Sequence, residues 1–184
     1  SGLSQDVETD DSVLRQTSAR LPWLLIGMLG GIGNSMILGN FDTTFAAHPE
    51  MALYIPLIGG TGGNVGTQSS ALVVQGLANS SLDANNTWKQ ILKESVVALI
   101  NATIISMLVY IYNFVRFGPT ATVSYSVSLS LFAVVMFASI FGTLVPMTLE
   151  KLKIDPAIAT GPFISITNDI IGMMLYMGIT VLLS

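Results

Sequence analysis

Long apolar stretches separated by short polar segments dominate the pattern of this 184-residue chain. Five stretches predict membrane-spanning helices, at about 22–39, 56–78, 91–114, 123–147 and 156–183. Each is long enough to cross a hydrocarbon core of about 30 Å, some with tilt. The partly apolar segment 41–55 predicts a short helix in the membrane interface. We therefore expect an all-α integral membrane protein with five transmembrane helices.

The composition agrees with this fold class, because 51% of the residues are hydrophobic and only 10% are charged. A soluble domain would carry about 25% charged residues. Residues 1–20 are polar and predict a frayed linker or a short amphipathic lead-in on the cytoplasmic side, ahead of a transmembrane domain over 21–184. The opening Ser1-Gly2 resembles the scar of a cleaved tag, which suggests an expressed fragment.

The distribution of basic residues predicts the orientation in the membrane. With a cytoplasmic N-terminus, six of the seven Lys and Arg residues fall inside: Arg15, Arg20, Lys89, Lys93, Lys151 and Lys153. Only Arg116 falls outside. We expect a multi-pass protein of the cell membrane, plasma or inner, with its N-terminus in the cytoplasm.

The last apolar stretch carries a lone carboxylate, Asp169. A charge near mid-bilayer costs about 3 kcal/mol, so this side chain should face protein or water and is a candidate functional site. A helical stripe of small and polar residues runs through it: Gly161, Ser165, Asp169 and Gly172. Pro162 has no amide hydrogen, so the carbonyl of Ile158 would be free to face a cation or water. An ion path and a polar seam between packed helices both remain open.

The second apolar stretch is rich in glycines and carboxamides. Four glycines fall within the five residues before Asn64, and one face carries Gly60, Asn64, Thr67, Gln68, Ala71 and Gln75. A close-packed dimer seam is one interpretation, but three amides on one face exceed what packing usually needs. Asn64 lies about 12 Å below the predicted outer end and Asp169 about 20 Å above the inner end. Their levels nearly coincide in a core of about 30 Å.

The motifs PLIGGTGGNVGTQSSALVVQGLA and VPMTLEKLKIDPAIATGPFISITNDIIG together resemble the membrane domain of the MgtE family of magnesium channels. The resemblance extends from about residue 20 to the end of the chain. It implies a homodimer whose pore lies on the two-fold axis, lined by the second and fifth helices of both subunits. It also implies that Asp169 forms an ion-selecting ring with its partner and that Asn64 lies nearby. The candidate metal-facing residues are Asp169, Asn64, Ser165, Gly161, Gly60 and Gln68.

In that family a cytoplasmic sensor, a pair of CBS domains and a connecting helix close the pore when intracellular magnesium is high. The 184 residues contain no sensor or CBS sequence, and residues 1–20 match at most the end of the connecting helix. Gly161 is a departure, because some relatives carry an amide side chain one turn below the position of Ser165.

The resemblance implies a magnesium-selective channel, with Mn²⁺ and other divalent cations as further candidates. Mg²⁺ gives up water reluctantly, so carboxylates and amides would hold the hydrated ion through its waters. A proton- or sodium-coupled carrier would be expected to show an inverted repeat, and none is evident. A purely structural subunit leaves Asp169 unexplained. We expect no enzymatic activity, since the single histidine, His48, has no partner motif, and we expect a second copy and lipid, not nucleic acid, as partners.

Overall fold

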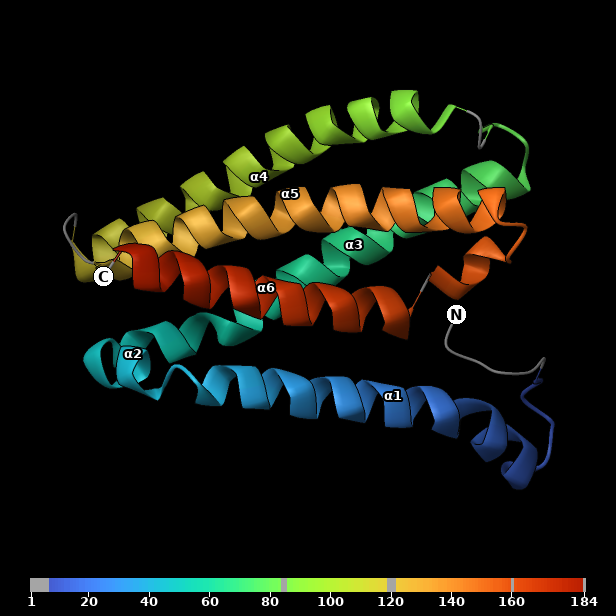
Figure 1. Cartoon of the computed structure of the whole chain (residues 1–184), viewed down its shortest axis with the longest axis horizontal. Coiled ribbons are helices and arrows are strands. Elements are labelled where there is room, and N and C mark those ends of the chain that lie inside the picture. The colour runs from blue at the N-terminus through green and yellow to red at the C-terminus, as the bar shows by residue number, and fades with distance from the viewer. Residues whose placement is uncertain (1–6, 84–85, 119–121, 160, 184) are drawn as a thin grey trace.

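The computed structural model describes residues 7–83, 86–118, 122–159 and 161–183. Five long helices run along the molecule: α1 (Val13–Gly39), α3 (Ile55–Ala78), α4 (Thr87–Phe117), α5 (Thr122–Lys151) and α6 (Pro162–Leu183) (Figure 1). Three short helical pieces connect them, α2 (Asp42–Ala47) and the 3₁₀ helices η1 (Pro49–Tyr54) and η3 (Pro156–Ala159). These described segments contain no strand, which confirms the all-α class.

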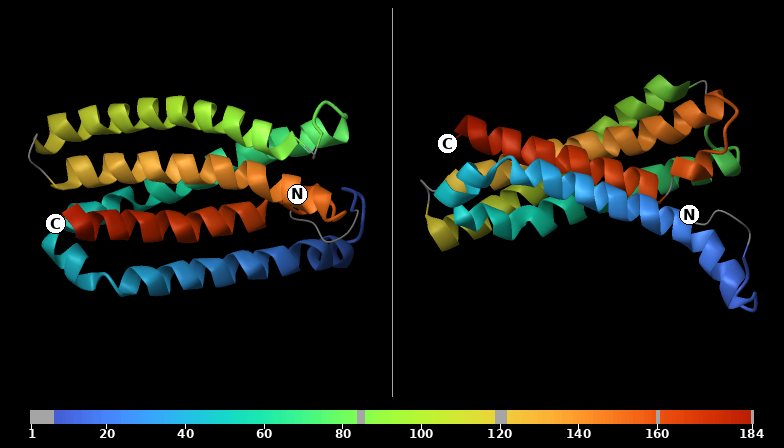
Figure 2. Two further views of the ribbon diagram at one scale, coloured as in Figure 1. Left: turned by 45° about the horizontal axis from the view of Figure 1, so that its top comes forward. Right: turned by 60° about the horizontal axis from the view of Figure 1, so that its bottom comes forward.

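The long helices form two layers. Helices α4, α5, α6 and α1 lie side by side in that order, and α3 crosses behind α5 and α6 (Figures 1 and 2). Successive long helices run in opposite directions, so α2, η1 and the C-terminal end of α6 lie at one end of the bundle (Figure 1). The start of α1, the α3–α4 connection and η3 lie at the other end. Helix α3 therefore contacts two neighbours along its length.

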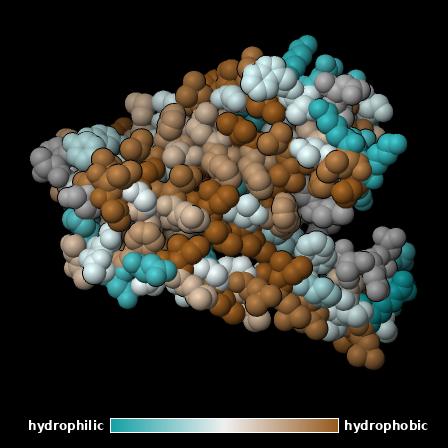
Figure 3. Space-filling view, in the orientation of Figure 1, coloured by the Kyte–Doolittle hydropathy of each residue, from teal (hydrophilic) through white to brown (hydrophobic). Residues whose placement is uncertain are grey.

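Four of the helices are long and apolar enough to cross a membrane, judged over the described residues by length and composition: α1, α4, α5 and α6. Helix α3 has 24 residues, but its glycines and amides make it less apolar than these four helices, so it does not qualify by composition. Apolar side chains cover the middle of the surface, and polar ones gather at the end where α1 begins (Figure 3). Five crossings remain a prediction with which this arrangement is compatible.

Most predicted boundaries are close to the observed ones, with two differences. Helix α1 begins at Val13, so part of the expected linker is helical, and α1 bends in its N-terminal part (Figure 2), where Pro22 lies inside the helix. The last helix begins at Pro162 instead of residue 156. A proline at the first helical position breaks no hydrogen bond. Ile158 belongs to η3, so its placement within the last helix is wrong, while a free carbonyl at Ile158 stays a prediction.

Glycines bring α3 into close contact with α5 and α6. A methyl group built at Gly142 of α5 would lie 2.5 Å from the carbonyl oxygen of Gly66 on α3. A methyl group at Gly66 itself would overlap Asn168 of α6, and one at Gly62 would lie 2.8 Å from Val134 of α5. Helices α3 and α5 therefore approach each other backbone to backbone at Gly66 and Gly142, and α6 packs the Asn168 side chain against Gly66, as small residues allow in membranes.

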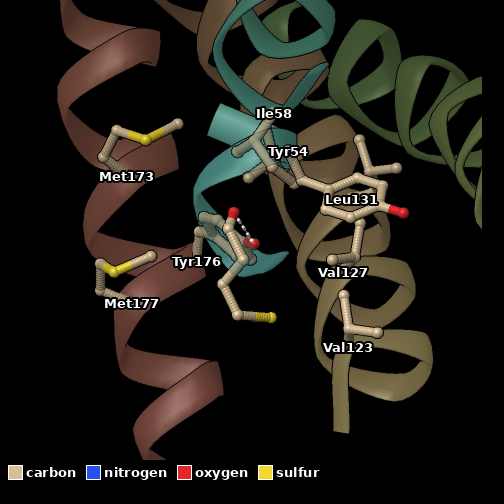
Figure 4. Close-up of a cluster of buried hydrophobic side chains, with 10 residues drawn as sticks. Tyr54, Ile58, Val123, Val127, Leu131, Met173, Tyr176 and Met177 are labelled. Atoms are coloured by element: carbon tan, nitrogen blue, oxygen red, sulfur yellow. Dashed lines mark hydrogen bonds between the residues drawn. The ribbon is translucent and has the colours of Figure 1, made fainter. Parts of the chain in front are cut away.

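The main cluster of buried apolar side chains fills the end of the bundle near η1. It consists of Met51, Tyr54, Ile58, Val123, Val127, Leu131, Val134, Met173, Tyr176 and Met177 (Figure 4). The Tyr176 hydroxyl donates a hydrogen bond of 2.7 Å to the carbonyl of Met51, which fixes the short connecting helices to α6. The Tyr54 hydroxyl donates to Asn113 of α4. These bonds satisfy two buried phenols and position the start of α3.

Helix α1 packs on α6 through a different glycine from the ones the sequence suggested. The small-residue spacing of Gly27 and Gly31 predicts the close contact, but no other heavy atom lies near either position within this subunit. Gly30 makes the contact instead, against Ile166 of α6. Helix α1 also exposes many large apolar side chains, among them Leu24, Met28 and Ile32, as expected for a helix at the edge of a bundle in lipid.

Candidate ion site on helices α3 and α6

The Asp169 carboxylate lies on a flat patch of α3 made by glycine. Methyl groups built at Gly59 and Gly63 would be 3.4 Å and 3.7 Å from Asp169 Oδ1. These two glycines are four residues apart, so they occupy one face of α3 on successive turns. Any larger side chain there would occupy the space beside the carboxylate. The glycine motif thus lets the carboxylate lie directly against the second helix.

Asp169 is half-buried and forms no hydrogen bond or ion pair with the described residues. If it served only as polar contact between helices, its oxygens should accept a hydrogen bond from a neighbouring helix. Instead both oxygens remain available to water or a cation. An unpaired charge among membrane helices is costly, so a ligand of positive charge or a water-filled space would stabilise this arrangement.

The amide side chains of α3 begin directly after the glycines that contact this carboxylate, and they face outward. Asn64 directly follows Gly63, and Gly60, Asn64 and Gln68 are all exposed in the single subunit. A methyl group at Gly60 would meet no other heavy atom within 4 Å. The predicted agreement in depth between Asn64 and Asp169 is therefore consistent with the contact of Asp169 at Gly63. The polar face of α3 has no covering element within the subunit.

The predicted stripe on α6 is only partly as expected. Ser165 is half-buried one turn before Asp169, and its amide donates to the carbonyl of Gly161 at 3.1 Å. Gly161 has a φ of 126°, a conformation that favours glycine, so the bend before α6 depends on it. Gly172 does not belong with these residues, because it is buried against Val134 and Ile58. The helix turns this position toward the core.

Two buried polar residues were missed by the sequence analysis, one beside Asp169 and one on α4. Asn168 is 1% exposed, and neither of its amide atoms has a hydrogen-bond partner among the described residues. Its position beside Gly66 depends on how α3 and α6 cross, which the sequence does not state. Glu94 of α4 is also buried, on a stretch that was expected to be apolar nearly all round. Its spacing from Ala98, Ala102 and Ser106, at every fourth residue, was the available signal.

One subunit offers few ionisable groups for holding a divalent cation. No cluster of three or more His, Cys, Asp or Glu side chains occurs in the described ranges. His48 Nδ1 lies 3.6 Å from Glu50 Oε1 at the end of the bundle that contains α2 and η1. No third His, Cys, Asp or Glu among the described residues joins this pair. The oxygens near Asp169 are hard ligands of the kind that Mg²⁺ prefers, and Mg²⁺ typically keeps several of its waters.

A helical bundle with several apolar helices and an unpaired carboxylate, Asp169, held against the glycines of a second helix is typical of a multi-pass membrane transport protein. Comparison with known sequences makes the assignment specific. The MgtE family, described as divalent cation transporter, matches residues 55–179. The chain belongs to this family.

Curated relatives agree with this assignment. The chain is 31% identical over 175 residues to the magnesium transporter MgtE of Bacillus subtilis, covering 95% of this chain and 39% of the relative. It is 33% identical over 165 residues to the magnesium transporter MgtE of Thermus thermophilus, covering 90% and 36%. The chain thus spans less than two fifths of these relatives. The predicted resemblance is confirmed, and the relatives are named as transporters instead of enzymes.

Proposed function

We propose that two copies of this chain form a magnesium channel whose pore is lined by α3 and α6 of both subunits. The observation that carries the proposal is the position of Asp169, whose unpaired carboxylate lies on the glycines of α3 beside Asn64. The exposed amides of α3 supply a polar wall. A second copy facing this wall would enclose it and bring two Asp169 carboxylates to one level. Family membership supports divalent cation transport as the activity.

The chemistry of this arrangement favours a hydrated ion. Two carboxylates and the neighbouring amides offer too few ligands for an octahedral shell at about 2.1 Å, so the ion keeps waters that donate to these oxygens. Selectivity then depends on the size of the hydrated ion and on the field of the carboxylates. The same ring could pass Mn²⁺ or other divalent cations with similar hydrated shells.

The charge distribution supports a cytoplasmic N-terminus. Lys89 and Lys93 lie near the start of α4, and Lys151 ends α5. These positions are at the same end of the bundle as the start of α1 (Figure 1). Positive residues concentrate on the cytoplasmic side of membrane proteins. The channel would therefore open outward near α2 and η1 and inward near η3.

Magnesium uptake by proteoliposomes tests the proposed pore. Asp169→Asn keeps the shape of the side chain and removes its charge, so we expect divalent flux to fall by at least about tenfold, because an ion in a low-dielectric pore loses a strong attraction. The matched control is Asp42→Asn on exposed α2, which should stay within about twofold because exposed charges are well screened. Gel filtration must show that both variants keep the oligomeric state of the parent. Parent-like flux through Asp169→Asn would refute the assignment.

A further inference from the structure

A buried carboxylate on α4 joins three helices on the side of α3 that faces away from its exposed amides. Glu94 Oε1 accepts hydrogen bonds of 2.7 Å from Ser69 Oγ on α3 and 2.7 Å from Ser139 Oγ on α5. The two hydroxyl oxygens lie 3.2 Å apart. Glu94 is 9% exposed, Ser69 5% and Ser139 2%. Three oxygens from three helices therefore form a closed triangle inside the subunit.

No basic side chain in the described part of the chain forms an ion pair with this carboxylate. The ion pairs of the described residues are Arg15 with Asp11 and His48 with Glu50, and neither involves Glu94. Helix α3 carries no ionisable residue, and those of α5 are Tyr125, Glu150 and Lys151, at least eleven residues from Ser139. On α4 itself, the neighbouring Lys93 is exposed and lines a surface pocket with Lys89 and Gln90. A buried carboxylate without a cation is unfavourable by several kcal/mol.

The composition of the triangle limits what can neutralise it. One carboxylate and two hydroxyls balance a single positive charge. A divalent ion would leave a net charge of +1 among buried side chains, and Mg²⁺ demands about six oxygens at near-octahedral positions. Hydroxyl groups can turn their lone pairs toward a small cation or keep donating to a carboxyl group, since the hydroxyl proton rotates.

We propose that Glu94, Ser69 and Ser139 bind one Na⁺ ion at a site inside each subunit. Gln90, one turn before Glu94, lines a pocket of about 450 Å³ at the surface, which places solvent one helical turn away. Ser69 directly follows Gln68 on α3, so occupancy of the triangle fixes the rotation of that helix and the direction of its amides. The site is separate from the contact between Asp169 and α3.

Thermal unfolding of the detergent-solubilised protein tests the site without any transport measurement. The melting temperature is compared in about 150 mM NaCl and in an equal concentration of choline chloride at pH 8. Na⁺ binding should raise the melting temperature by about 3–6 °C at a tenfold excess over its dissociation constant.

Variants assign the response to the triangle. Glu94→Gln keeps the hydrogen-bond acceptor without the charge, so the response to Na⁺ should disappear. Ser69→Ala with Ser139→Ala keeps the charge and removes both hydroxyls, which should weaken a Na⁺ response, and it covers the case in which Glu94→Gln fails to fold. Glu150→Gln, an exposed carboxylate at the end of α5, is the matched control and should respond like the parent. Asp169→Asn should also keep the response, which separates this site from the pore.

Two outcomes would overturn the proposal. One is a parent protein whose melting temperature is the same in Na⁺ and in choline. The other is a response of equal size in the parent, in Glu94→Gln and in the double serine variant, because the charge would then bind elsewhere.

Discussion

Gly142 and Gly66 set the distance between α5 and α3. A methyl group built at Gly142 would lie 2.5 Å from the Gly66 carbonyl oxygen and 3.1 Å from its Cα atom. Both are backbone atoms of a buried helix, so they cannot move aside as the end of a flexible side chain would. The nearby amide of Asn168 restricts α3 from the side of α6.

Gly142→Ala should therefore lower the free energy of unfolding by about 1–3 kcal/mol, the range seen for overpacked interiors. This loss outweighs the gain of about 1 kcal/mol in helix propensity that alanine normally brings. Gly33→Ala on α1 is the control, since a methyl group there meets no heavy atom within 4 Å, and it should not destabilise. Equilibrium unfolding in mixed micelles measures both. Equal stability of the two variants would mean that α3 and α5 can separate at little cost.

At the residue scale the sequence indicated Asp169 and the glycine-rich stretch, but not which residues of that stretch contact the carboxylate. A charge in an apolar stretch is visible without a structure, and so is a run of glycines. Which glycine meets which helix depends on crossing angles, and these are set by the whole packing. For this reason Gly30, rather than Gly27 or Gly31, makes the contact with α6, and Asn168 was overlooked beside Asp169.

Among the elements, α3 is the one whose two faces differ most. Its buried face carries Gly62, Gly66, Ser69, Ser70 and Val73, and its exposed face carries Gly60, Asn64, Gln68 and Gln75. The first set packs on α5 and α6, while the second set faces no other element. Position along the exposed face should then decide how strongly each amide affects an ion near Asp169.

Asn64→Leu should reduce magnesium flux more than Gln75→Leu does. Asn64 follows Gly63, which contacts Asp169, whereas Gln75 lies eleven residues further, about 16 Å along the helix. Both changes replace an exposed amide with an apolar side chain of similar size, so each serves as the control for the other. Initial rates of uptake in the same liposome preparation compare them. Equal losses would contradict the depth assignment.

The extents of the helices followed well from apolar stretches, because lipid requires long apolar helices. The ends of the helices were predicted less well. Helix α1 begins at Val13, inside the segment expected to be a linker, and Pro162, which was placed inside the last helix, is its first residue. Glu94 was overlooked because seven of the ten residues after it are apolar. Its spacing of four residues from the next small residues nevertheless marks a buried stripe on α4. Periodicity of small and polar positions was thus a better guide than mean apolarity.

For the molecule as a whole, regulation by internal magnesium is the property most open to test. The described residues contain no cluster of three or more acidic, His or Cys side chains that could bind a cation strongly. Glu150 and Asp155 are exposed at the end of the bundle that we propose faces the cytoplasm, where salt screens them. A ligand shifts an equilibrium between open and closed forms only through a difference in affinity.

We expect flux through a protein made of these 184 residues to fall by less than about threefold when inner magnesium rises from zero to about 10 mM at constant driving force. Single-channel recording of open probability measures this directly. Steep, cooperative closure would show that the membrane part senses magnesium itself. In that case Glu150→Gln and Asp155→Asn would be the first variants to examine, with Asp42→Asn at the opposite end as the control.

The contact of α1 with α6 has a mechanical consequence. Gly30 rests against Ile166, which precedes Asp169 by three residues and so lies about one helical turn from the carboxylate. Helix α1 packs mainly on α6, and its other side faces outward. A force applied to the segment before α1 would therefore be transmitted to α6 through the contact between Gly30 and Ile166. Force, and not only a bound ligand, could then move the carboxylate.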